Sequence, residues 1–210
     1  MPTIDEARNW YDPKDPVHGF NHILRVYHLA ERLALAEGAD LEIVRAAALL
    51  HDAEGPGVEE ARLEHQHASA QFAADVLKSE GWPVERIAAV QHCIRSHRFR
   101  DPSEQPQTIE AKVLFDADKL DAIGAIGAVR AIAFAVLAKQ DLYIQPSEKF
   151  IRTGEKESGE PHTPYHEHIF KLSKIKDRMF TRTGRAMAEA RHQYLEGFFV
   201  QLNAELMGEC

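Results

Sequence analysis

The sequence predicts an all-α protein, and three observations support this class. Apolar residues recur at helical spacing along most of the chain, as in the run Val26, Leu29, Ala30 and Leu33. Glycine and proline stand where these runs stop, as they do at helix ends. No run of alternating β-branched residues and no internal repeat occurs. Because 210 residues is an ordinary length for one domain, we expect a single helical domain over 1–210.

The expected helices follow one another with clear stops. The first four cover 21–37, ended by Gly38; 41–52, ended by Gly55-Pro56-Gly57; 67–80, ended by Gly81; and 83–97, which begins at Pro83. A loop around Pro102 and Pro106 leads to helices over 108–120 and 122–139. The polar segment 145–164 contains three prolines and two glycines and is expected to be a mobile loop. Two long helices, 165–182 and 184–206, are expected to pack on a core of 18–140.

Composition and charge exclude several classes of protein. The chain has 33 Asp and Glu against 25 Lys and Arg, and a net charge of −8 argues against non-specific binding of duplex nucleic acid. Only Cys93 and Cys210 occur, which excludes a disulfide scaffold and favours a reducing compartment. The N-terminus lacks the features of a secretory signal, and the longest weakly polar run, 122–138, is too short to span a membrane. We therefore expect a cytoplasmic protein without a membrane partner.

Ionisable side chains lie on the apolar faces of separate expected helices. Each stands at helical spacing from apolar residues: His22 from Val26, Leu29 and Leu33; His51 from Val44, Ala47 and Ala48; His97 from Ile87, Val90 and Ile94; and Asp118 from Leu114. These side chains are therefore expected to point inward.

A shared metal ion would explain this convergence. A single inward histidine is usually a hydrogen-bonded core residue, and a single aspartate near a helix end is usually a cap. Buried carboxylates, however, are costly unless they are paired or bind a metal. Adjacent His51 and Asp52 lie about 100° apart around a helix axis, yet both can reach one site because the helix ends there.

Three motifs, in this order, resemble the HD-domain metal-dependent phosphohydrolase superfamily, whose pattern is H…HD…D on a helical bundle. They are Asn21-His22-Ile23-Leu24-Arg25-Val26, Leu49-Leu50-His51-Asp52 and Asp116-Ala117-Asp118-Lys119-Leu120-Asp121. Segments 122–127, 171–177 and 191–192 are similar to a small bacterial branch linked to hydrolysis of nucleoside triphosphates, chiefly deoxy ones. The resemblance covers the chain from about His18 to Glu205.

The resemblance implies that one divalent metal ion is bound by His22, His51, Asp52 and Asp118. It also implies hydrolysis of a small nucleotide, most directly a (deoxy)nucleoside triphosphate, by attack of metal-bound water, with manganese as the expected metal. Two imidazoles and two carboxylates also suit Fe²⁺, Ni²⁺, Co²⁺ or Zn²⁺, and Mg²⁺ less well.

Neighbouring residues are candidates for catalysis and substrate binding. Glu54 is the first candidate for the base that deprotonates the water, with a solvated charge as its alternative, and Asp121 is the second. Arg25 and Lys119 either bind phosphate oxygens or form salt bridges to ligand carboxylates. His67 and His97 are expected to contact phosphate or water, whereas His65 is expected at the surface or in packing.

The C-terminal part offers weaker candidates. Lys171 and Lys174 lie in a stretch, 171–191, with seven basic and two acidic residues, and either line a polyphosphate channel or form a solvated face. A second metal cluster at 162–168, with His162, His166 and His168, is disfavoured by its place in a loop. Residues 195–200 are expected to pack in the core, with a homodimer contact as the alternative.

Other functions remain as alternatives. A nucleotide phosphodiesterase or nucleotidase of the same superfamily would use the same ligands. A di-iron oxygenase on this scaffold would need His67 and His97 as further ligands. A non-catalytic nucleotide sensor would bind without turnover, but the intact ligand set argues against it. The sequence does not distinguish the base, the sugar or the leaving group.

Overall fold

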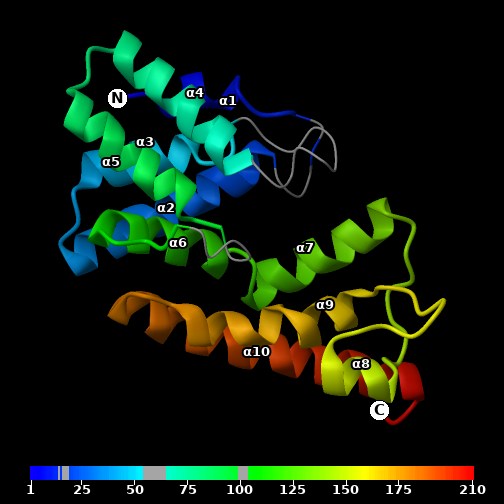
Figure 1. Cartoon of the computed structure of the whole chain (residues 1–210). Helices are drawn as coiled ribbons and strands as arrows, with labels where there is room; N and C mark the ends of the chain where they lie inside the picture. Colours follow the sequence, from blue (N-terminus) through cyan, green and yellow to red (C-terminus); the bar gives the residue numbers. More distant parts are fainter. Residues whose placement is uncertain (14, 16–18, 54–64, 99–103) are drawn as a thin grey trace. The chain divides into compact units, whose positions relative to one another are not determined.

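The computed structural model describes residues 1–13, 15, 19–53, 65–98 and 104–210 (Figure 1). These residues form helices and connecting turns without a strand, so the predicted all-α class is confirmed. The chain divides into two compact units. Unit 1 comprises Met1–Lys119 and Met179–Gly184, and unit 2 comprises Leu120–Arg178 and Arg185–Cys210. The chain thus leaves unit 1 after Lys119 rather than near residue 140, and the single domain over 1–210 stays a prediction.

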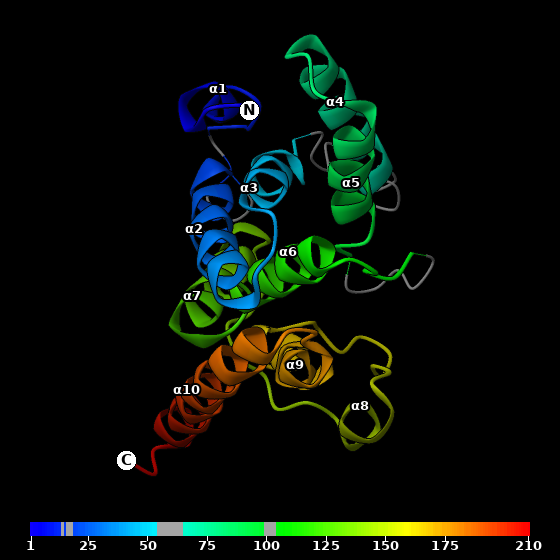
Figure 2. The ribbon, with the colours of Figure 1, turned by 90° about the vertical axis from the view of Figure 1, so that its left-hand side faces the viewer.

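In the described part of the chain, the helices of unit 1 bury a shared apolar core. They are α1 (Ile4–Arg8), α2 (Phe20–Glu37), α3 (Leu41–Leu50), α4 (His65–Ser79), α5 (Val84–Arg95) and α6 (Ile109–Leu120). The last residue of α6, Leu120, already belongs to unit 2. Helix α3 packs against α2, α4 and α5, and α4 packs along α5 (Figure 2). Ile23, Leu49 and Ile94 are completely buried in this core.

Helix α1 was not predicted from the sequence, although its start carries a recognisable signal. The Thr3 side chain accepts a hydrogen bond from the backbone of Glu6, and the Glu6 carboxylate accepts one from the backbone of Thr3 at 2.8 Å. This reciprocal capping box stabilises a helix start. The helix is only five residues long and so has no apolar periodicity to reveal it.

Two helix starts near the expected metal ligands follow from local sequence. Asp40 caps α3 by accepting hydrogen bonds from the backbone of Glu42 and Ile43, as an N-cap carboxylate does. Gly19 caps α2, and a Cβ atom there would lie 2.2 Å from the carbonyl oxygen of Asp15. Only glycine therefore allows this close approach of the two backbones before His22.

A buried carboxylate in α6 holds the segment Met179–Gly184 in unit 1. Asp116 accepts hydrogen bonds from the backbone of Phe180 at 2.9 Å, and from the backbone and hydroxyl of Thr181 at 2.8 Å and 2.7 Å. A Cβ atom on Gly184 would lie 2.3 Å from Asp116 Oδ2, so glycine makes room for this carboxylate.

Unit 2 contains α7 (Gly124–Leu137), α8 (Glu148–Thr153), α9 (Pro164–Phe170), the 3₁₀-helix η2 (Leu172–Arg178) and most of α10 (Arg182–Met207). The expected helix over 165–182 is wrong, because α9 ends at Phe170 and a 3₁₀-helix follows. The buried residues of η2, Leu172 and Ile175, are three positions apart. A 3₁₀-helix has three residues per turn, so it places both on one side.

Segment 145–164 is more structured than a mobile loop. It contains α8, and Glu160 holds its two ends together. The Glu160 carboxylate accepts hydrogen bonds from the backbone and hydroxyl of Ser147 at 2.7 Å and 2.8 Å, and it contacts His166 Nε2 at 3.1 Å. In α10, Leu195 and Phe199 are buried as expected for core packing, whereas Val200 is 68% exposed.

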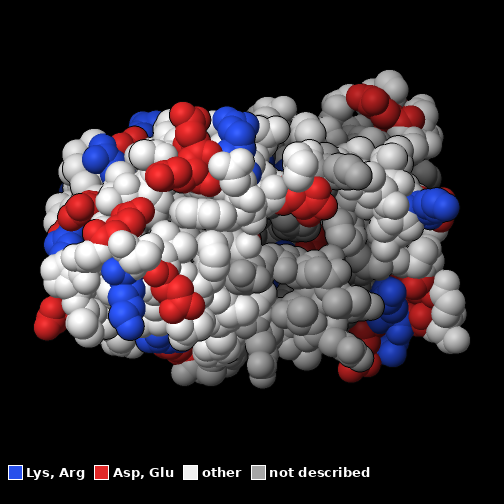
Figure 3. All heavy atoms as spheres, turned by 90° about the horizontal axis from the view of Figure 1, so that it is seen from above, with Lys and Arg blue, Asp and Glu red and all other residues white. Residues whose placement is uncertain are grey.

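The surface and the helix lengths bear on possible partners. On the face drawn in Figure 3, acidic and basic side chains of the described residues are interspersed rather than separated by sign. In the described part of the chain, no single helix is long and apolar enough to cross a membrane; α6 and α7 reach the required hydropathy only when taken together across a break.

Candidate metal centre

His51 and Asp52 are presented by the end of α3. The ring of His51 is completely buried, and its Nδ1 lies 2.9 Å from the carbonyl oxygen of Ala48. Because a carbonyl only accepts hydrogen bonds, Nδ1 carries the proton and Nε2 keeps a free electron pair. This is the tautomer that a metal ligand requires.

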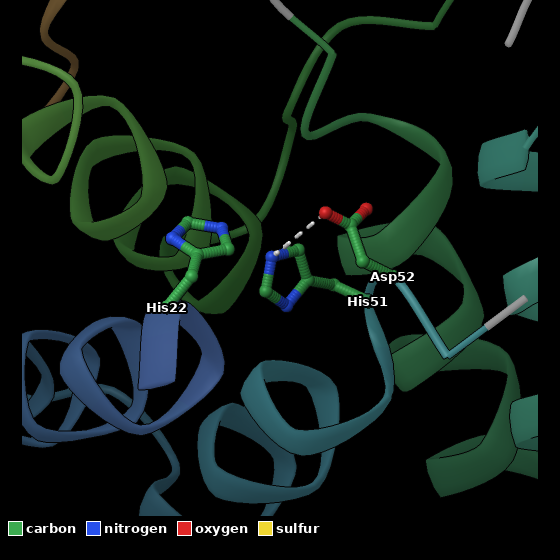
Figure 4. A group of neighbouring side chains, drawn as sticks. All are labelled: His22, His51 and Asp52. Atoms are coloured by element: carbon green, nitrogen blue, oxygen red, sulfur yellow. Dashed lines mark ion pairs between the residues drawn. The ribbon is translucent and has the colours of Figure 1, made fainter. Parts of the chain in front are cut away.

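Three candidate ligands converge around the Nε2 atom of His51. The ligand atoms of His22, His51 and Asp52 all lie within 4.8 Å of one another. Figure 4 shows His22 extending from α2 toward the His51 ring, with Asp52 on the other side, where Oδ2 lies 3.7 Å from His51 Nε2. The rings of the two histidines meet edge to face, with centroids 5.6 Å apart.

Asp118 reaches the same histidines from α6. Its Oδ1 atom lies 3.4 Å from His22 Nε2, and the side chain is 13% exposed. The four residues predicted as ligands thus come from α2, from α6 and from the turn that directly follows α3, all in unit 1. The prediction that both histidines point inward is confirmed. Asp118 also contacts Lys119, its neighbour in sequence.

The electrostatics of the cluster favour a neutral imidazole beside two carboxylates. Burial lowers the pKa of His51 to about 4, although Asp52 and Asp118 oppose this change. Burial alone would raise the pKa of Asp52, but the imidazoles of His51, His65 and His97 hold it well below its usual value. For Asp118, burial is likewise outweighed by Lys119 and His22, so its pKa is also well below the usual value. These are the protonation states that metal binding requires.

The donor set fits a divalent metal ion. His51 Nε2 and Asp52 Oδ1 are buried and have no hydrogen-bond partner in the described part of the chain. Such orphaned atoms are costly unless something else binds them. Ligand atoms at about 2.1 Å from one ion lie about 3–4 Å from each other, and the distances of 3.4 Å and 3.7 Å fall in that range. Nitrogen and carboxylate ligands together suit Mn²⁺, Fe²⁺, Co²⁺, Ni²⁺ or Zn²⁺.

A second group of candidate ligands shares Asp52. Its Oδ1 atom lies 3.4 Å from His65 Nε2 and 3.5 Å from His97 Nε2. His97 repeats the arrangement of His51, because its Nδ1 lies 2.5 Å from the carbonyl oxygen of Ile94 and leaves Nε2 free. The three ligand atoms lie within 4.8 Å of one another, so this group could also hold a metal ion.

The structure corrects the expectation for His65 and separates it from His67. His65 is the first residue of α4 and lies beside Asp52, so its assignment to surface or packing is wrong. Two positions along a helix correspond to about 200° of rotation. His67 is accordingly exposed, and its contact with substrate stays a prediction.

The structure describes only one of the two candidate bases, Asp121. Glu54 lies outside the described residues. Asp121 is 1% exposed, and its carboxylate forms an ion pair with Arg130 at 2.7 Å. A carboxylate that is paired with a guanidinium accepts a proton less readily.

The basic candidates also have partners. Lys119 is 12% exposed and sits with its ammonium group against Asp118, while Arg25 is half-buried on α2. In unit 2, Lys171 pairs with Glu167 at 3.1 Å, and Lys174 lies 5.5 Å from the centre of the Phe170 ring. A role of either lysine in binding polyphosphate stays a prediction.

The histidines of segment 162–168 are used in local contacts. His166 lies against the Thr163 hydroxyl and Glu160, and His162 lies 3.2 Å from Glu167. His168 Nε2 lies 3.1 Å from Glu196. Among the described residues, groups able to hold a metal occur only around Asp52, so this structure gives no support to a second cluster at 162–168.

Comparisons with known proteins agree with this geometry. A family model described as HD domain matches residues 19–123, which contain all four predicted ligands. YpgQ of Bacillus subtilis strain 168 is 34% identical over 215 residues, covering 99% of this chain and 96% of YpgQ.

Solved structures extend the likeness to nearly the whole chain. The crystal structure of Bacillus subtilis YpgQ in complex with ADP is similar with a TM-score of 0.73 and 33% identity, over 97% of both chains. An HD-superfamily hydrolase from Bacillus thuringiensis is similar with a TM-score of 0.70 and 30% identity, over 97% of this chain and 96% of that one. The chain therefore belongs to the HD-domain phosphohydrolase superfamily and is a metal-dependent hydrolase.

Proposed function

We propose that this hydrolase acts on a small nucleotide, most directly a (deoxy)nucleoside triphosphate. The observation that carries the proposal is the convergence of His22, His51, Asp52 and Asp118 beside a lysine in one unit. Support also comes from a relative, because YpgQ was crystallised with ADP. The cytoplasmic location and a possible homodimer stay predictions.

We assign the binding of one divalent ion, with Mn²⁺ preferred, to His22, His51, Asp52 and Asp118. When bound, such an ion neutralises charge on a phosphate and lowers the pKa of water. The free Nε2 pair of His51 and the ionised Asp52 are ready to bind without first losing a proton. The complete burial of His51 keeps bulk water from weakening its contacts.

Lys119 and Arg25 are assigned to the substrate phosphates. The ammonium group of Lys119 already balances the charge of Asp118, and a phosphate oxygen next to that carboxylate would lie within its reach. His97 is assigned a contact with phosphate or water, because its free Nε2 faces Asp52. Lys171, Lys174 and His67 are retained as weaker candidates.

Glu54 is the preferred base for removing a proton from water, since the pairing of Asp121 with Arg130 disfavours the second candidate. Glu54 stands two positions after Asp52 in the sequence. Asp121 would instead fix the turn that follows α6, because Arg130 also contacts its backbone oxygen at 3.3 Å.

The group formed by Asp52, His65 and His97 favours one competing function. With two metal ions sharing Asp52, the centre would have the ligands that a di-iron oxygenase needs, although with His65 in place of His67. A phosphodiesterase or nucleotidase would use the same residues as a triphosphate hydrolase. Metal counting and product analysis separate these functions.

The test is a product-resolved screen of the full chain against ribo- and deoxynucleotides with Mn²⁺, Mg²⁺, Co²⁺, Fe²⁺, Ni²⁺ or Zn²⁺. We expect chelator-sensitive release of phosphate, pyrophosphate or triphosphate from nucleoside triphosphates. Release of nucleoside from monophosphates alone would indicate a nucleotidase. Tight nucleotide binding without any turnover would contradict the proposal and identify a sensor.

A further inference from the structure

The N-terminal segment 4–11 lies outside the part of the chain that matches the HD domain, yet it contacts the helices that carry the metal centre. Helix α1 packs against α3. The guanidinium of Arg8 lies 4.5 Å from the centre of the Phe20 ring, at the start of α2. Trp10 meets Phe72 of α4 edge to face, with ring centroids 5.4 Å apart. The segment therefore touches three helices of unit 1.

Tyr11 is the residue of this segment that reaches the end of α3. Its hydroxyl donates a hydrogen bond of 2.7 Å to the carbonyl oxygen of Leu49, 38 positions away. That carbonyl is one of the last four of α3, which have no partner within the helix. It stands two positions before His51.

The contact between Tyr11 and Leu49 lies inside the protein. The Tyr11 residue is only 8% exposed, and the hydrogen bond from its hydroxyl is buried. A buried donor that loses its acceptor is costly, so this contact ties Tyr11 to the end of α3.

The ring of Tyr11 contacts the other helix that carries a ligand. Its centroid lies 6.0 Å from that of Phe20, the first residue of α2, and Phe20 stands two positions before His22. One buried side chain thus contacts both segments that present the ligand atoms of His22, His51 and Asp52.

We propose that Tyr11 is a positioning residue of the metal centre, and that it fixes the separation between His22 and the His51–Asp52 pair. The hydroxyl holds the end of α3, and the ring holds the start of α2. This inference rests on the proposed metal ligands. Ligand sets must be held to within about 0.5 Å to bind tightly, and the residues that orient them are commonly as important as the ligands.

The test measures Co²⁺ binding to the metal-free full chain by calorimetry, together with the visible absorption of bound Co²⁺, which reports coordination geometry. Tyr11→Phe keeps the ring but removes the donor to Leu49. Phe20→Leu keeps the hydroxyl but removes the ring contact. Tyr27→Phe is the matched control, because Tyr27 is also buried in unit 1 but faces Glu31 and Arg45 rather than the ligands. Thermal midpoints of the metal-free proteins record any general loss of stability.

We expect Tyr11→Phe to weaken Co²⁺ binding about tenfold and to change the absorption band. Phe20→Leu should weaken Co²⁺ binding several-fold. The Co²⁺ affinity of Tyr27→Phe should stay within twofold of the wild type, even if its thermal midpoint falls as far as that of Tyr11→Phe. Unchanged Co²⁺ affinity and absorption in both Tyr11→Phe and Phe20→Leu would overturn the role of Tyr11 alone. Failure of the wild type itself to bind Co²⁺ would overturn the metal site and this inference together.

Discussion

His51 and His97 are prepared for metal binding by the carbonyl groups three positions before them. Each ring donates from Nδ1, to Ala48 at 2.9 Å and to Ile94 at 2.5 Å. Both carbonyls belong to the last turn of a helix. That of Ile94 also accepts a hydrogen bond from the backbone of His97 at 3.4 Å. The contact at the helix end thus fixes the tautomer of each ring and leaves Nε2 unprotonated.

At the residue scale, Asp116 offers a stability prediction that is separate from metal binding. Replacing Asp116 by Ala leaves the backbone N–H groups of half-buried Phe180 and buried Thr181 without their acceptor. We expect the free energy of unfolding to fall by about 3 kcal/mol, measured by chemical denaturation of the metal-free protein. The exposed Asp177→Ala is the control. An equal effect of both substitutions would contradict the role given to Asp116.

Helical spacing was sufficient to predict that His22 on α2 and His51 directly after α3 point inward, because both helices have apolar stripes. It was insufficient for His65. The helix predicted from the sequence begins at His67, whereas α4 begins at His65, and it is His65 that lies beside Asp52. The tautomers of His51 and His97 depend on carbonyl groups at helix ends, and the spacing of apolar residues alone does not define where a helix ends.

At the element scale, α3 is the helix on which the centre depends most. Asp40 caps its start and forms a two-pronged ion pair with Arg86 of α5, at 2.9 Å and 3.0 Å. Its end is held by Tyr11 and by the His51 ring. The sequence predicted the extent of this helix to within two residues, because Asp40 and the apolar run are strong local signals. The break between α9 and η2 was missed because the same apolar spacing of three suits both helix types.

Segment 145–164 gives a prediction about pH. The backbone hydrogen bond from Ser147, followed by that from Glu157 and others, lowers the pKa of Glu160 from 4.5 to about 2. A lowered carboxyl pKa stabilises the fold above the unfolded value, and this stabilisation is lost as the pH falls from about 4.5 toward 2. The wild type should therefore have a higher thermal midpoint than Glu160→Gln at pH 6, and this difference should be smaller at about pH 3.5.

The control for that measurement is Glu157→Gln, since the side chain of Glu157 is exposed in the same segment. Its midpoint should follow the wild type at every pH. A gap for Glu160→Gln that stays constant across this range would show that the carboxylate does not hold the segment together.

At the scale of the whole molecule, the predicted ligands and Lys119 lie in unit 1, whereas Asp121, Lys171 and Lys174 lie in unit 2. The helices of unit 1 are fixed by a buried core and therefore give the metal ligands a rigid frame. The acidic chain also gains from a bound cation, because Asp52 and Asp118 are both held ionised next to the same histidines.

We propose that His22, His51, Asp52 and Asp118 hold the ion on which hydrolysis depends. The most direct measurement is a calorimetric Mn²⁺ titration paired with a nucleoside triphosphate hydrolysis assay on the same preparations of wild type, His51→Ala and His28→Ala. His28 is exposed on α2 and serves as the matched control. We expect one ion per chain and full activity in the wild type and in His28→Ala, and loss of both in His51→Ala. Unchanged Mn²⁺ binding and full hydrolysis in His51→Ala would contradict the account.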